Sequence, residues 1–180
     1  MKPILQAIRL FGLLTVITGV IYPLLVTAGA SLFCSRTVLN GSLMDRNGQP
    51  VGSALLAQPF KSPRYFQPRP SASDFATVPS GASNFGPTSA TLKTDIAKRR
   101  ALLGTGAPEE LLTTSGSGLD PHISPEAARY QLTRVATARN LPPARIAELI
   151  RETTELPQWG VFGKPRVNVL SLNLRLDALK

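Results

Sequence analysis

The chain has no charged residue between Arg9 and Arg36. The uncharged stretch at positions 10–35 would form a helix about 39 Å long at roughly 1.5 Å per residue, and the hydrocarbon core of a bilayer is about 30 Å thick. No other part of the sequence is as long and as apolar. The sequence therefore predicts one transmembrane helix at positions 10–35, between a short segment at positions 1–9 and one domain at positions 36–180.

A cleaved secretory signal is the alternative interpretation of this stretch. Positions 28–30 read Ala-Gly-Ala and look like a cleavage site. The apolar run before them covers positions 10–27, whereas the hydrophobic part of a signal has about 7–15 residues. We therefore predict an anchor that is retained in the membrane.

The residues before the span predict its orientation. Lys2 and Arg9 lie in this short segment. Short basic flanks stay in the cytoplasm, whereas long domains cross the membrane largely regardless of their charge. In a bacterium, we expect a single-pass protein of the inner membrane with a cytoplasmic N-terminus and a periplasmic main domain.

One face of the span is small or weakly polar. Its members recur at three- and four-residue spacing: Gly12, Thr15, Gly19, Pro23, Thr27 and Ala30. Small residues let helix backbones approach closely in lipid, so we predict that this face packs against a partner helix. The predicted seam comprises Gly12, Thr15, Gly19 and Pro23. The alternative is that Gly and Pro are simply frequent in membrane helices. Pro23 should also kink the helix or loosen one turn.

The domain after the span is basic. The chain has 20 Lys and Arg against 11 Asp and Glu, and two of the basic residues precede the span, so the domain carries a net charge of about +7. Nucleic acid is not expected outside the membrane, which leaves membrane lipid, an acidic partner or a solvated basic surface. One cysteine and one histidine cannot form an intramolecular disulfide or a zinc site, so we expect no bound metal.

Turn signals dominate the first half of the domain. Positions 41–57 read as a hairpin around Asn47-Gly48, the dipeptide most typical of a tight turn. Positions 58–91 are rich in Pro, Gly and Ser and show little periodicity. Their aromatic residues include Tyr65, Phe66, Phe75 and Phe85, which argues against disorder. An irregular segment this long is unusual inside a domain and is often functional.

Helical patterns dominate the second half. Helices are expected at positions 92–103, in one turn at 108–112, at 125–139 behind the N-cap Ser124, and from 143 to 152. The alternation at positions 167–177 predicts a strand with a bulge, or two short strands. A hairpin, helices and a final strand indicate an α+β domain.

A catalytic site would have to use the one histidine. Ser115, Asp120 and His122 are close in sequence and suggest a membrane-anchored hydrolase as an alternative function. The pattern G-x-S-x-G fits in no register, and Asp120 lies too close to His122 in the chain to orient its ring from behind. The phosphate-binding pattern G-x-x-x-x-G-K-[ST] is also absent. We therefore expect no catalytic residue, and the sequence identifies no cofactor-binding residue.

Ordered motifs run through the whole chain. After the span come GSALLAQPF (52–60), PRYF (63–66), RPSA (69–72), SNFGP (83–87), SGSGLDPHISPEAA (115–128) and PRVNVL (165–170). In this order they resemble the C subunit of the Kdp potassium-transporting P-type ATPase. Small departures from the family pattern occur at Gln67-Pro68, Ala82 and Phe85, all within the long irregular segment.

The resemblance implies an accessory subunit of an ATP-driven, high-affinity potassium import pump. The implied partners are a channel-like potassium-binding subunit, a P-type ATP-hydrolysing subunit and a small fourth subunit. The family role is that of a catalytic chaperone, which raises the ATP affinity of the hydrolysing subunit, so ATP enters only through the complex. Because ATP is cytoplasmic and the domain is expected outside, any such effect must pass through the membrane partners. A cap over the potassium entrance is the alternative within the family.

The motifs also suggest residues for the outer interface. The loop 62–87 and the turn around Asp120 are expected to contribute to it. The candidate interface or motif residues are Arg64, Tyr65, Phe66, Asn84, Gly86, Ser115, Gly116, Asp120, Pro121 and His122.

Overall fold

The computed structural model describes residues 2–33 and 41–179. It divides the chain into two compact units, residues 1–42 and residues 43–180. The last two positions of the predicted span, Cys34 and Ser35, lie outside the described residues.

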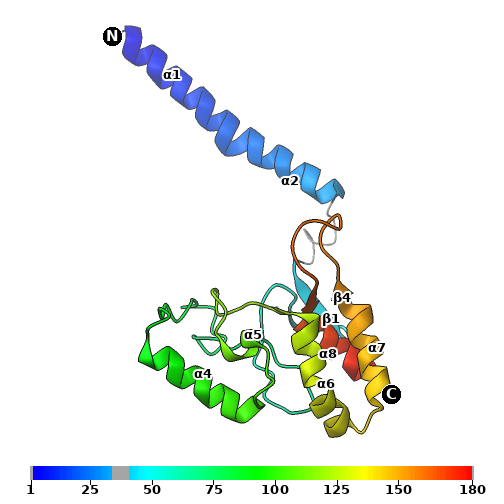
Figure 1. Cartoon of the computed structure of the whole chain (residues 1–180). Helices are drawn as coiled ribbons and strands as arrows, with labels where there is room; N and C mark the ends of the chain where they lie inside the picture. Colours follow the sequence, from blue (N-terminus) through cyan, green and yellow to red (C-terminus); the bar gives the residue numbers. More distant parts are fainter. Residues whose placement is uncertain (1, 34–40, 180) are drawn as a thin grey trace. The chain divides into compact units, whose positions relative to one another are not determined.

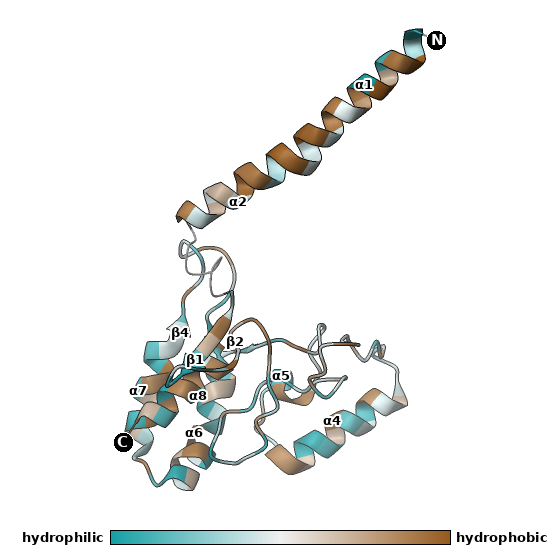
Figure 2. Ribbon diagram, turned by 180° about the vertical axis from the view of Figure 1, so that it is seen from behind, coloured by the Kyte–Doolittle hydropathy of each residue, from teal (hydrophilic) through white to brown (hydrophobic). Residues whose placement is uncertain are grey.

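The first unit is a helix (Figure 1) that is apolar along most of its length (Figure 2). It consists of α1 (Lys2–Val16), the π-helical turn η1 (Ile17–Ile21) and α2 (Tyr22–Phe33). Lys2–Phe33 is long and apolar enough to cross a membrane. The helix starts well before position 10 and so includes part of the predicted N-terminal segment.

The π-helical turn confirms that one turn of the helix is loosened near Pro23. Proline has no N–H to donate to the preceding turn, and its ring crowds the carbonyl four residues earlier. A π-bulge is one of the ways in which a helix accommodates such a break. The hydroxyls of Thr15 and Thr18 donate to the carbonyls of Phe11 and Leu14, at 2.8 Å each, and so satisfy their own hydrogen bonds inside the helix.

The second unit begins with the predicted hairpin. Strands β1 (Leu43–Arg46) and β2 (Gln49–Ser53) pair antiparallel, with a register shift between Met44 and Asp45. Asn47 and Gly48 both have positive φ, at 54° and 77°, which is the conformation that a two-residue hairpin loop requires. The hairpin prediction is therefore confirmed.

Helices make up most of the regular structure of the second unit. They are α4 (Ala90–Leu103), α5 (Glu109–Leu112), α6 (Pro125–Arg139), α7 (Pro143–Thr153) and α8 (Val169–Ala178). A small antiparallel sheet completes the unit with β3 (His122–Ile123), β4 (Thr154–Glu155) and β5 (Arg166–Asn168), in the order β3-β5-β4. The mixed helices and sheet confirm the α+β prediction.

The core lies where α6, α7 and α8 meet the small sheet (Figure 1). Its fully buried side chains include Ile123, Val135, Ile146, Ile150, Val167, Leu172 and Leu176. Phe66 joins them from the long irregular segment and has no exposed surface. By contrast, α4 buries no residue and lies on the far side of that segment.

The predicted C-terminal strand is wrong beyond Asn168. The strand β5 ends there, and α8 follows, with the Asn168 side chain accepting from the Ser171 N–H at 3.0 Å as an N-cap. Leucines at every second position suggest a strand, but the buried set follows the helical spacing of three and four residues. That set is Val169, Leu170, Leu172, Asn173 and Leu176. Asn173 is polar and yet buried, so the sequence pattern of buried positions in this helix was not recognised.

Candidate interface around the long loop and the Asp120 turn

The segment at positions 54–89 contains no helix or strand, yet side chains from distant helices hold its backbone in place. The amide of Asn173 in α8 accepts from the Phe66 N–H and donates to the Phe66 carbonyl, at 2.9 Å each. The amide of Gln131 in α6 does the same for Gln67, at 2.8 and 2.9 Å. Each amide replaces one residue of a neighbouring strand, so backbone that would otherwise be buried and unsatisfied is fully paired.

Two arginines of α6 fix the preceding residues of the loop. Arg134 donates to the carbonyls of Pro63 and Tyr65, at 2.7 and 3.1 Å, and burial lowers the pKa of its guanidinium. Arg139 donates to the Arg64 carbonyl at 2.8 Å and pairs with Asp177 at 2.6 Å. Its guanidinium also lies 4.8 Å from the centre of the Tyr65 ring. The conformation of the loop is thus set by side chains of α6 and α8.

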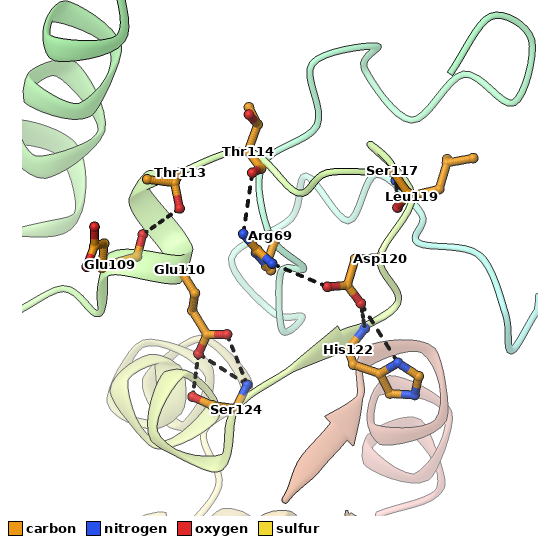
Figure 3. Close-up of polar contacts among 10 residues, drawn as sticks. All are labelled: Arg69, Glu109, Glu110, Thr113, Thr114, Ser117, Leu119, Asp120, His122 and Ser124. Atoms are coloured by element: carbon orange, nitrogen blue, oxygen red, sulfur yellow. Dashed lines mark hydrogen bonds and ion pairs between the residues drawn. The ribbon is translucent and has the colours of Figure 1, made fainter. Parts of the chain in front are cut away.

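The Asp120 turn is joined to the next part of the loop (Figure 3). The Arg69 guanidinium donates to Asp120 Oδ2 at 3.4 Å and to the Thr114 carbonyl at 3.3 Å. The Ser115 N–H donates to the Pro70 carbonyl at 3.0 Å. At Gly118, with φ of 72°, an added Cβ would lie 2.8 Å from the Gly81 carbonyl oxygen, so only glycine lets the two segments approach this closely.

His122 lies at the end of this turn, at the start of β3. Its backbone N–H donates to Asp120 Oδ1 at 3.0 Å, and its Nδ1 lies 3.8 Å from the same oxygen. Burial, assisted by the charge of Arg166, lowers the pKa of the His122 imidazole below its usual value, although Glu155 and Asp120 oppose the shift. The imidazole is therefore neutral near pH 7.

A carboxylate that the sequence analysis did not single out links two helices nearby. Glu110 in α5 accepts from the Ser124 N–H, at 3.1 and 3.3 Å, and from the Ser124 hydroxyl. The same hydroxyl accepts from the Ala127 N–H at 3.0 Å and caps α6, as predicted. The sequence indicated only a helical turn at positions 108–112, and nothing in it pointed to a contact between Glu110 and Ser124.

The candidate residues differ in how far they reach solvent. Arg64, Asn84, Gly86 and Gly116 are exposed, whereas Tyr65, Asp120, Pro121 and His122 are half-buried. Phe66 and Ser115 are buried and can act on an interface only through the backbone that they hold. The loop and the Asp120 turn therefore form one continuous structure. Its exposed residues, Arg64, Asn84, Gly86 and Gly116, form what we call the rim.

The alternative catalytic arrangement is not assembled. Ser115 is 2% exposed. Among residues 2–33 and 41–179, no hydrogen bond joins His122 to Ser115 or Ser117. In the same ranges, no three His, Cys, Asp or Glu residues gather as they would around a metal ion.

A cavity of about 800 Å³ lies between the loop, α4 and α6. Phe60, Phe75, Leu103 and Tyr130 are among its apolar lining residues, and Lys61, Arg99 and Arg134 also line it. Arg99 donates to the Leu112 carbonyl at 2.7 Å, and Arg134 is engaged as described above. Both guanidinium groups thus donate to backbone carbonyls of the domain.

The predicted seam lies on the helix of the first unit, which has no buried residue among positions 2–33. An added Cβ at Gly12 or Gly19 would meet no atom within 4 Å. Substitution at these positions is therefore free of steric cost within the chain, and any cost would come from a partner helix.

Comparison with known proteins gives one consistent family. The family model described as "K+-transporting ATPase, c chain" (KdpC) matches residues 4–178. A potassium-transporting ATPase KdpC subunit of Dechloromonas aromatica is 46% identical over 190 aligned positions, covering 99% of each chain. The subunit of the same name from Cereibacter sphaeroides is 48% identical over 169 positions, covering 92% of this chain and 91% of the relative.

Proposed function

The chain belongs to the KdpC family of potassium-transporting ATPase subunits, and on that premise we propose that it is an accessory subunit without catalytic chemistry of its own. Its role is to stabilise an ATP-driven, high-affinity potassium import pump and to raise the ATP affinity of the hydrolysing subunit. ATP is then bound by that subunit, and this chain supplies neither a cofactor nor a metal.

One observation carries this proposal. The polar motif residues of the loop and the Asp120 turn bind backbone groups and one another, as the Arg69, Asp120 and Thr114 contacts illustrate. Motifs of an enzyme would present a reactive group at an accessible position. Motifs that build a fixed and partly exposed surface suit a subunit that acts by contact.

We place the domain outside the cytoplasm, because Lys2 and Arg9 lie on the N-terminal side of the uncharged stretch at positions 10–35, and basic residues beside a span stay in the cytoplasm. The seam at Gly12, Thr15 and Gly19 then packs on the channel-like subunit within the membrane. The exposed rim of the loop and the Asp120 turn contact the outer parts of the complex, which also includes the hydrolysing subunit and the small fourth subunit. An effect on ATP therefore passes across the membrane through these partners.

The ATP dependence of the pump tests the proposal most directly. The complex is purified with and without this chain, and the KM for ATP is measured. We expect a higher KM without the chain and a similar rate at saturating ATP. An unchanged KM would limit the role to stabilisation, and unimpaired growth at scarce potassium after deletion of the chain would overturn the proposal.

The interface assignment has its own test. Arg64→Glu reverses an exposed charge on the rim, and Arg100→Glu makes the same change on the exposed face of α4. We expect the first variant to co-purify with less of the other subunits and the second to assemble normally. Equal assembly of both would place the interface elsewhere.

The hydrolase alternative predicts that the activity requires the hydroxyl of Ser115 or Ser117. A Ser115→Ala, Ser117→Ala double variant that still supports growth at scarce potassium contradicts it. Loss of growth with a normally assembled complex would favour it.

A further inference from the structure

The segment between β4 and β5 exposes a cluster of large apolar side chains. Leu156, Trp159, Val161 and Phe162 are 78%, 85%, 77% and 62% exposed. In Figure 1 this orange loop projects beyond the strands. We call residues 156–164 the apolar tip. Four large apolar side chains gathered on one short projection differ from singly scattered surface residues and mark a contact surface.

The apolar tip is a built turn. The Gln158 N–H donates to the Phe162 carbonyl at 2.9 Å, and the Phe162 N–H donates to the Gln158 carbonyl at 3.0 Å. The Trp159 and Phe162 rings meet edge to face with centroids 5.9 Å apart. Trp159 itself has φ of 54°, a conformation that is unfavourable for a bulky residue. The fold therefore maintains this turn, with its aromatic side chains outward, against a local backbone cost.

The composition of the apolar tip suits the surface of a bilayer. Tryptophan is enriched at the headgroup level of membranes, where its ring is apolar and its N–H remains hydrated. Lys164 follows the aromatic residues and forms no ion pair within residues 41–179. When the neighbouring rings lie in the headgroup region, such a free ammonium can reach the lipid phosphates while its alkyl stem stays in apolar surroundings.

The covalent connection keeps the apolar tip near a membrane. The apolar helix ends at Phe33 and β1 begins at Leu43, and ten residue steps span at most about 35 Å at roughly 3.3–3.6 Å each. The apolar tip lies at the end of the second unit where β1 begins (Figure 1). The end of the domain that the anchor tethers is thus the end that carries the exposed apolar residues.

We propose that the apolar tip inserts Trp159, Val161 and Phe162 into the headgroup region of the bilayer that holds the anchor. The Lys164 ammonium binds lipid phosphate at the same level. The domain then has a second attachment to the membrane, which limits its rotation about the anchor. This contact does not depend on the side of the membrane or on the pump's other subunits.

The test uses the only tryptophan of the chain, Trp159. The full chain is reconstituted in vesicles of phosphatidylethanolamine and phosphatidylglycerol, with or without bromine on the acyl chains. We expect Trp159 emission at short wavelength, loss of most of that emission in brominated vesicles, and little quenching by aqueous acrylamide. Emission typical of a hydrated indole, with equal intensity in both kinds of vesicle, would overturn the proposal.

Two variants control for folding and for non-specific adsorption. Val161→Ser with Phe162→Ser removes apolar surface but keeps the probe, and it should restore emission in brominated vesicles and shift it to longer wavelength. Leu102→Ser, at a residue that is 87% exposed on α4, should leave the quenching unchanged. Because these side chains are exposed, both proteins should keep the parent's circular dichroism. Equal quenching of the parent and the double variant would contradict the role assigned to the apolar tip.

A second measurement separates lipid from a protein partner. In the assembled pump, with Cys34→Ser and Val161→Cys in this chain, a membrane-impermeant maleimide reports access to the apolar tip. We expect protection in vesicles and rapid labelling of the same complex in detergent from which lipid has been removed. Equal protection in both would show that another subunit covers the apolar tip, and it would overturn the lipid assignment.

Discussion

Two irregular segments of the domain place aromatic residues in different surroundings. The long loop, residues 54–89, places Phe66 in the core with no exposed surface. The apolar tip, residues 156–164, turns Trp159 and Phe162 toward solvent. The loop is held by side chains from distant helices, whereas the turn of the apolar tip is closed by its own backbone.

The difference shows that regular structure is a poor guide to what a segment contributes to stability. A loop can belong to the core when buried amides take the place of strand partners, as Asn173 and Gln131 do here. A compact turn can lie outside the core and contribute surface alone. Substitutions in the two segments should therefore differ sharply in their effects on folding.

The largest difference is expected for the two phenylalanines. Phe66→Ala should lower the free energy of unfolding by about 3–5 kcal/mol, because it removes a fully buried ring. Phe162→Ala should change it by less than about 0.5 kcal/mol. Urea unfolding of the full chain in detergent micelles, followed by circular dichroism, measures both. Similar midpoints for the two variants would break the comparison.

The buried amide comes next. Asn173→Ala leaves the N–H and carbonyl of Phe66 buried without partners and should cost about 2–4 kcal/mol. Gln158→Ala removes an exposed amide of the apolar tip and should cost less than about 0.5 kcal/mol. The same urea series compares them. A small cost at Asn173 would mean that water replaces its hydrogen bonds.

The two arginine pairs sharpen the comparison further. The Arg139 side chain is 8% exposed, and its planar guanidinium joins Asp177 to the Arg64 carbonyl. Arg139→Lys removes this planar group and should lower the free energy of unfolding by about 1–2 kcal/mol. Arg166→Lys alters the exposed pair with Glu155 and should cost at most about 0.5 kcal/mol. Added salt should weaken the second pair more than the first. Equal costs would indicate that Arg139 is hydrated.

The smallest effect is a pH dependence at His122, which lies beside the Asp120 turn. The folded pKa of His122 lies below its unfolded value of 6.5, so the unfolded state binds more protons as the pH falls. The contribution of neutral His122 to the stability of the folded domain is complete above about pH 6.5 and is lost as the pH falls toward the folded pKa. In the His122→Gln variant, the urea midpoint should change less between about pH 7 and 5 than it does in the parent. An opposite slope would mean that the Asp120 carboxylate outweighs burial.

The sequence predicted the elements whose signals are local. Asn47-Gly48 makes the hairpin turn, Ser124 caps α6, and Ile146, Leu149 and Ile150 line the core as their spacing indicates. The C-terminal helix was missed because a buried asparagine looked like a surface residue. Its reason for burial, the Phe66 backbone, lies 107 positions earlier in the chain.

The candidate site was predictable as a set of motifs but not as an arrangement. The contacts of Arg134 and Arg139 with the loop join residues 69 to 75 positions apart, and local patterns carry no information about such pairs. The Glu110–Ser124 link joins residues 14 positions apart across an irregular turn, and no local pattern indicated it either. The exposed side chains of the apolar tip also follow no periodicity, since a tight turn places them.

The short connection from Phe33 to Leu43 has a consequence for binding strength. A group that is covalently held near its target meets it at an effective concentration on the order of millimolar. An attachment with a Kd of about 1 mM, or roughly −4 kcal/mol, is then occupied about half of the time. The same domain, cut from its anchor and used at micromolar concentration, would leave the bilayer almost entirely. A contact too weak to be found with the isolated domain can thus orient the whole subunit.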